Sequence, residues 1–160
     1  MKTALKITNV LSWINIIIAG ILVLGGLIGT LMSAGALTML LSVVLTGSIV
    51  LHSYATLQLR KSILNPEIPL SNQTSGGLRM VGFIALFFAI MNIMSAVMII
   101  QNAPEAAKQI TLPFKPEGFD VVSAIKFTGI FSLLFSIGVA VNVMLSFRLL
   151  KWYASAKNNS

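Results

Sequence analysis

Four long apolar segments are the feature that most limits how this chain can fold. They run over residues 8–31, 36–59, 80–101 and 127–147. Each segment is long enough to cross the hydrocarbon of a bilayer as a helix, which takes about 20 mainly apolar residues. Together they use more than half of the 160 residues. We therefore expect a single membrane domain over residues 1–160, built as an all-α, four-helix transmembrane bundle.

The composition agrees with a membrane protein and excludes several kinds of soluble site. Hydrophobic residues make up 56% of the chain and charged residues only 9%, whereas soluble domains carry about 25% charged residues. The chain has no cysteine, so it has no disulfide, thiol nucleophile or thiolate metal ligand. Its net charge of +7 comes from cations near the ends of the apolar segments. The expected partner of these cations is the lipid bilayer, and nucleic acid is not expected.

The distribution of positive charge predicts the topology. Cations precede the first segment, lie in the connection over residues 60–79 and follow the last segment, whereas the connection over residues 102–126 balances lysines with acidic residues. The positive-inside bias places the cation-rich regions in the cytoplasm. We expect a multi-pass protein of the cell membrane with both termini cytoplasmic, a cytoplasmic loop at 60–79 and an outer loop at 102–126. The first segment is longer than the apolar part of a cleavable signal peptide, so it is expected to remain. Five cations are expected to anchor helix ends at lipid headgroups: Arg60, Lys61, Arg79, Arg148 and Lys151.

The second half of the chain resembles the first. When the sequence is shifted by 90 positions, residues 42–61 fall on residues 132–151 without a gap, and His52 falls on Asn142. An internal duplication would give two tandem helical hairpins that run in the same direction through the membrane. Chance similarity between apolar helices is the alternative explanation.

One strongly polar amide or imidazole lies well inside each apolar segment. With a rise of about 1.5 Å per helical residue, three of these residues fall at a similar depth in the cytoplasmic half, and the fourth lies nearer the middle. We therefore expect one interhelical hydrogen-bond cluster made by Asn15, His52, Asn92 and Asn142.

Small residues at helical spacing predict where the helices touch. Lipid tails are as apolar as leucine, so helices in a membrane associate through close packing and buried polar groups. The expected helix-packing residues are Gly25, Gly29, Ala85, Ala89 and Gly138.

His52 is the only histidine of the chain, and its position has two interpretations. An ionisable residue inside a membrane span is a functional-site candidate by default, so His52 could bind a proton, a quinone or a haem iron. However, no aspartate or glutamate lies inside any apolar segment, although proton paths commonly use carboxylates. We favour the interpretation that His52 is a structural member of the polar cluster.

No constellation of catalytic residues is recognisable. A serine nucleophile would need a nearby base, for which only His52 is available, and the sequence has no Gly-x-Ser-x-Gly motif. We therefore expect no enzymatic activity, no cofactor and no metal site. The expected function is that of an accessory, assembly or interaction subunit, bound to another membrane protein or to its own copy. The alternatives are a small transporter or channel formed by oligomers, and a redox subunit that binds haem or quinone through His52.

Overall fold

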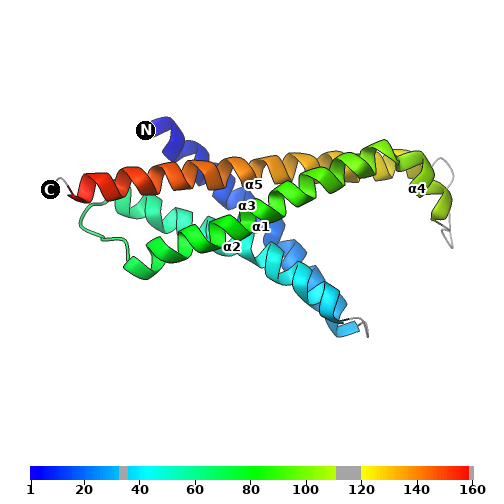
Figure 1. The fold of residues 1–160 in the computed structure, drawn as a ribbon, viewed down its shortest axis with the longest axis horizontal. Helices are drawn as coiled ribbons and strands as arrows, with labels where there is room; N and C mark the ends of the chain where they lie inside the picture. The colour runs from blue at the N-terminus through cyan, green and yellow to red at the C-terminus, as the bar shows by residue number, and fades with distance from the viewer. Residues whose placement is uncertain (33–35, 111–119, 159–160) are drawn as a thin grey trace.

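The computed structural model describes residues 1–32, 36–110 and 120–158. All regular structure in these residues is helical, and four of the helices are long and apolar enough to cross a membrane. The predicted all-α architecture with four candidate spans is therefore confirmed. The helices, shown in Figure 1, are α1 (Lys2–Met32), α2 (Ala36–Leu64), α3 (Asn72–Gln101), α4 (Ala103–Gln109) and α5 (Val121–Asn158).

The long helices continue beyond the apolar segments. α2 ends at Leu64 and α3 begins at Asn72, so the connection between them is shorter than the loop expected over residues 60–79. Prolines at 66 and 69 explain why the helix stops there, because proline lacks a backbone N–H and clashes with the preceding turn. Lysine in the last turn of α2 also interacts favourably with the negative end of the helix dipole.

The four long helices form two pairs. α1 packs mainly along α2, and α3 packs mainly along α5, while α2 also contacts α3 and α1 also contacts α5. Both chain termini lie at the same end of the molecule, together with the connection over residues 65–71 (Figure 1). We call this end the terminal end, and the end that carries α4 the far end.

The two pairs cross near the terminal end and diverge toward the far end (Figure 1). Among the residues whose exposure is described, the buried ones of α1 lie between Leu5 and Ala19, and those of α2 between Thr46 and Ser62. In residues 20–29 and 40–45 of this pair, most of the large apolar side chains are exposed. We call residues 20–29 and 40–45 the α1–α2 arm.

Two apolar clusters hold the crossing region together. The first, nearer the terminal end, includes Leu5, Leu59, Leu78 and Leu149, one from each long helix. The second cluster draws on the same four helices and contains Ala19, Ile49, Ala85, Ala89, Val139 and Val143.

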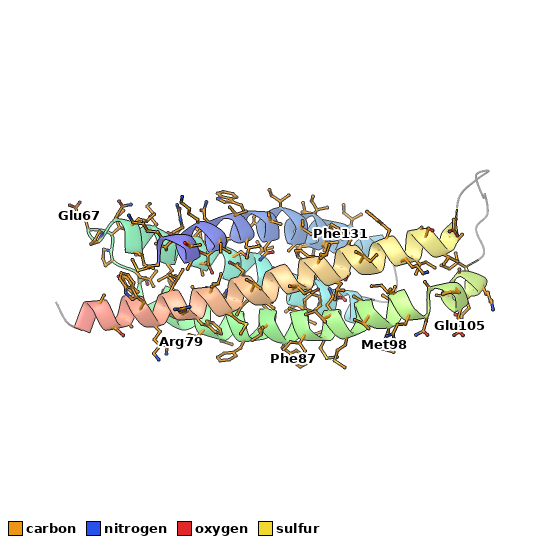
Figure 2. All side chains as sticks on the ribbon, turned by 90° about the horizontal axis from the view of Figure 1, so that it is seen from above. Glu67, Arg79, Phe87, Met98, Glu105 and Phe131 are labelled. Atoms are coloured by element: carbon orange, nitrogen blue, oxygen red, sulfur yellow. The ribbon has the colours of Figure 1, made fainter. Side chains whose placement is uncertain are left out.

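The outer faces of the bundle are apolar as well. Phe87 and Met98 of α3, for example, point away from the other helices (Figure 2). A surface of this kind suits a lipid environment, because exposed apolar area carries no penalty there.

Candidate functional site

Polar side chains fill part of the buried crossing region. They recur at helical spacing on α1, α2 and α5, so these three helices turn a polar face toward their neighbours. The buried polar residues are Thr8, Ser12, Asn15, Thr46, Ser48, His52, Ser53, Thr56, Ser62, Ser136, Asn142 and Ser146.

His52 joins α2 to α5. Its Nε2 lies 2.9 Å from the hydroxyl oxygen of Ser146 on α5 and 3.4 Å from that of Thr56, one turn further along α2. Ser146 also donates to the carbonyl of Val143 at 2.7 Å, and Thr56 donates to the carbonyl of His52 at 2.9 Å. Because these hydroxyls are tied to their own helices, they hold the imidazole in a fixed position.

The other side of the imidazole is enclosed by α3 and an aromatic ring. A Cβ added to Gly82 would lie 2.9 Å from Cε1 of His52 and 2.7 Å from Cε1 of Phe147. The Phe147 ring meets the imidazole edge-on, with centroids 6.1 Å apart. His52 is only 1% exposed, and its Nδ1 has no hydrogen-bond partner in the part of the chain that the structure describes.

Asn142 joins α5 to α1. Its Nδ2 donates to the hydroxyl of Ser12 at 3.3 Å, and the same hydroxyl lies 3.4 Å from its Oδ1. Asn142 and Ser146 are four residues apart on α5, so the contacts with α1 and with α2 use one face of this helix. Asn15 is buried one turn after Ser12, and its Nδ2 has no partner among the described residues.

Asn92 makes a separate contact within the α3–α5 pair. Its Nδ2 donates to the hydroxyls of Ser132 at 3.1 Å and Ser136 at 2.8 Å. Unlike the other three residues of the expected cluster, it is partly exposed.

The four residues expected to form one cluster therefore lie in separate contacts. In the described residues, no hydrogen bond joins any two members of the set Asn15, His52, Asn92 and Asn142. The bonds that His52, Asn92 and Asn142 make to a facing helix run instead to serines. A short amide or imidazole reaches one neighbouring helix, and for these three residues a serine hydroxyl lies at that position.

Two of the expected packing residues on α3 lie in the core. Ala85 and Ala89 are buried in the second apolar cluster, where α3 meets the other three helices. Gly138 of α5 is partly buried, and a Cβ there would make an ordinary contact of 3.8 Å with Leu11 of α1.

The glycines of α1 lie differently from the expectation. Gly25 is exposed, and a Cβ added there would meet nothing within 4 Å, while Gly29 is partly exposed. The close approach to α2 occurs at the next residue, Gly26, where a Cβ would lie 2.8 Å from Val43. The helical rotation of 100° per residue separates these neighbouring glycines onto different faces.

Sequence reasoning did not single out Gly82, although it gives α3 its closest approach to the polar contacts. The available signal was its place on the face formed by residues 78, 82, 85 and 89, where the other members are leucine and alanine. A small residue in such a row indicates close packing. The row alone does not reveal that the facing residues are His52 and Phe147.

The five cations expected at lipid headgroups all lie on parts of their helices that are near the terminal end of the molecule. Four of them are exposed and one, Arg60, is partly buried. The Nε of Arg60 has no hydrogen-bond partner among the described residues. The exposed cations are Lys61, Arg79, Arg148 and Lys151.

Neither a metal centre nor a known relative assigns a function to this arrangement. Within residues 1–32, 36–110 and 120–158, no group of three or more histidine, aspartate or glutamate side chains is placed to hold a metal ion. Comparisons with protein families, curated proteins and solved structures found no match to the chain.

Proposed function

We propose that this chain is a non-enzymatic integral protein of the cell membrane, with both termini in the cytoplasm, that acts as an accessory or assembly subunit. In this proposal the α1–α2 arm binds a transmembrane helix of another membrane protein or of a second copy. The observation that carries the proposal is the arm itself, a two-helix projection that diverges from the α3–α5 pair (Figure 1) and exposes most of its large apolar side chains.

The distribution of polar groups supports this function. Most polar side chains deep in the helices face inward, and two buried pairs, Ser12 with Asn142 and His52 with Ser146, bond across helices. In a bilayer such bonds stabilise helix association by about 0.6 to 2 kcal/mol each. These groups therefore suit the assembly of the bundle, and the surface that remains for recognition is mainly apolar.

The surface of the arm suits a helix as its partner. Large exposed side chains, including Ile21, Leu24 and Leu41, alternate with Gly20 and Gly25, which have open space around them. Transmembrane helices associate by close packing at small residues, which allow the backbones to approach. The two glycines lie about 140° apart around α1, so a second helix can pack into the open space beside either of them.

The enclosure of His52 argues for its structural role. The imidazole is 1% exposed, Nε2 is held by two hydroxyls, and α3 closes against Cε1. A haem iron or quinone would need an open approach to the ring, and a proton path commonly uses carboxylates, which none of the four apolar segments contains. These requirements make the transporter and redox alternatives the weaker explanations.

Site-specific photocrosslinking in native membranes tests the contact of the arm. A photoreactive amino acid replaces Leu24 in the arm or, as a matched control, Leu134 of α5; these leucines are 62% and 65% exposed. We expect a protein crosslink of one defined mass from position 24 and lipid adducts from position 134. Twice the chain mass identifies a second copy, and any other defined mass identifies a different protein. Lipid adducts alone at both positions would refute the proposed contact.

A further inference from the structure

We propose that a cavity between α3 and α5 at the terminal end binds the phosphate of one anionic phospholipid. The cavity has a volume of about 180 Å³ and is lined by two cations and three apolar residues. They are Arg79 and Phe83 of α3 and Phe147, Leu150 and Lys151 of α5. This inference rests on the proposed membrane insertion but not on the contact made by the arm.

The two cations are available to an external anion. Arg79 and Lys151 are exposed, and neither forms an ion pair within the part of the chain that the structure describes. Glu67 is an acidic residue in the connection between α2 and α3 at the terminal end. It lies on the opposite side of the bundle from Arg79 (Figure 2). Two cations on one rim with no carboxylate between them favour a phosphate, which accepts hydrogen bonds from both.

The apolar part of the cavity favours a lipid over free phosphate. The rings of Phe83 and Phe147 lie with centroids 5.2 Å apart, and Phe83 is largely exposed. Phe87 is also exposed and lies four residues further along α3, so the two phenylalanines form one continuous apolar track. An acyl chain can follow this track while the phosphate stays at the cationic rim.

The α1–α2 pair lacks the same combination and supplies a control. In the alignment shifted by 90 positions, Lys151 corresponds to Lys61, but Phe147 corresponds to Leu57. Lys61 and Lys6 are exposed cations near the same end of the molecule and do not line the cavity. Substitution of Lys6 and Lys61 therefore removes the same charge as substitution of Arg79 and Lys151, but from outside the proposed site.

The test is native mass spectrometry of the full chain, purified in mild detergent and titrated with phosphatidylglycerol or phosphatidylcholine. We expect one phosphatidylglycerol to bind preferentially to the wild type. The double variant R79Q/K151Q should weaken this binding about tenfold, given the attraction that each cation exerts on anionic lipid. The control K6Q/K61Q should change it less than twofold, and R79K/K151R should retain most of it because the charges remain. Gel filtration verifies that each variant is folded.

Three outcomes would overturn the inference. The first is equal binding of the two lipids to the wild type. The second is an equal loss in R79Q/K151Q and K6Q/K61Q, because the attraction would then come from net charge. The third is displacement of the lipid by excess sodium phosphate, which would make free phosphate the ligand. All three are independent of whether position 24 crosslinks to a protein.

Discussion

The α1–α2 and α3–α5 pairs are similar near the terminal end of the molecule and differ toward the far end. Near the terminal end, α2 and α5 bury six corresponding positions when the sequence is shifted by 90, although Ser48, Ser62 and Leu150 are buried without a buried counterpart. The matching buried pairs are Thr46 and Ser136, Ile49 and Val139, His52 and Asn142, Ser53 and Val143, Thr56 and Ser146, and Leu59 and Leu149. Toward the far end, the α3–α5 pair keeps polar contacts through Asn92, whereas the α1–α2 pair projects as the arm.

This comparison separates the parts that assemble the bundle from the part available to a partner. His52 and Asn142 occupy corresponding positions, and each bonds a serine on another helix. The match is what an internal duplication predicts, with α2 and α5 in equivalent places. The single histidine is then one version of a polar contact that the other half makes with an amide.

The largest effect on stability is expected at Gly82, where α3 packs closely against His52 and Phe147. Gly82→Leu should lower the free energy of unfolding by about 1–3 kcal/mol, because the new side chain overpacks Phe147 and His52. The matched change Gly25→Leu in the arm has open space and should cost less than about 0.5 kcal/mol. Unfolding by sodium dodecyl sulfate in mixed micelles measures both. Similar losses in the two variants would contradict the assigned packing.

The equivalence of His52 and Asn142 predicts a graded response to substitution. His52→Ala should destabilise the protein by about 2 kcal/mol, since it removes the bond to Ser146 and leaves a cavity. His52→Asn should recover roughly half of this loss, because an amide works at the corresponding position of α5. The same unfolding assay applies. If His52→Asn is as unstable as His52→Ala, the proposed equivalence of His52 and Asn142 is contradicted.

A hydrogen bond at the terminal end gives a smaller effect. The backbone N–H of Leu70 donates to the hydroxyl of Tyr153 at 3.0 Å, which ties the connection between α2 and α3 to α5. Tyr153→Phe should cost about 1 kcal/mol and speed hydrogen exchange at the Leu70 amide. Tyr54→Phe is the control, since Tyr54 is exposed and its hydroxyl accepts a hydrogen bond from Gln58 on its own helix. If hydrogen exchange at the Leu70 amide is unchanged in Tyr153→Phe, this hydrogen bond does not hold the connection to α5.

The smallest effects are the couplings between single polar pairs. Double-mutant cycles with alanine should give about 0.6 kcal/mol for Ser12 with Asn142, and a similar value for His52 with Ser146. The crossed pair, Ser12 with Ser146, shares no hydrogen bond and should couple by less than about 0.3 kcal/mol. A crossed coupling as large as the direct ones would indicate one continuous network instead of two corresponding contacts.

The sequence predicted the helices and the buried polar residues better than it predicted their partners. Long apolar segments and helical spacing are local signals, so they located four helices and the inward face that carries His52 and Asn142. Serines are common on every helix and carry little positional information, so the partners Ser12 and Ser146 were not foreseen. The close packing at Gly82 was not predicted because it depends on Phe147, a bulky side chain that faces this glycine from α5.

The arm could not be predicted for a related reason. In a membrane chain, leucine and isoleucine suit both lipid and protein contacts, so hydrophobicity does not show which faces meet. The same limit applies to Gly25 and Gly26. They are the same amino acid, but a Cβ at Gly25 would have open space whereas a Cβ at Gly26 would meet Val43. Hydropathy also misses helical turns made of polar residues, which is why α2 and α5 extend beyond their apolar segments.

The most direct test of the proposed function is native mass spectrometry of complexes extracted gently from membranes. The wild type should appear with a stoichiometric protein partner or as a defined oligomer. The variant Gly20→Leu/Gly25→Leu should lose that partner while the chain stays folded, because its new side chains fill the open space on the arm. The same double change at Gly76 and Gly77, which also have open space, should leave the complex intact. A wild-type chain that is monomeric and carries only lipid would contradict the account.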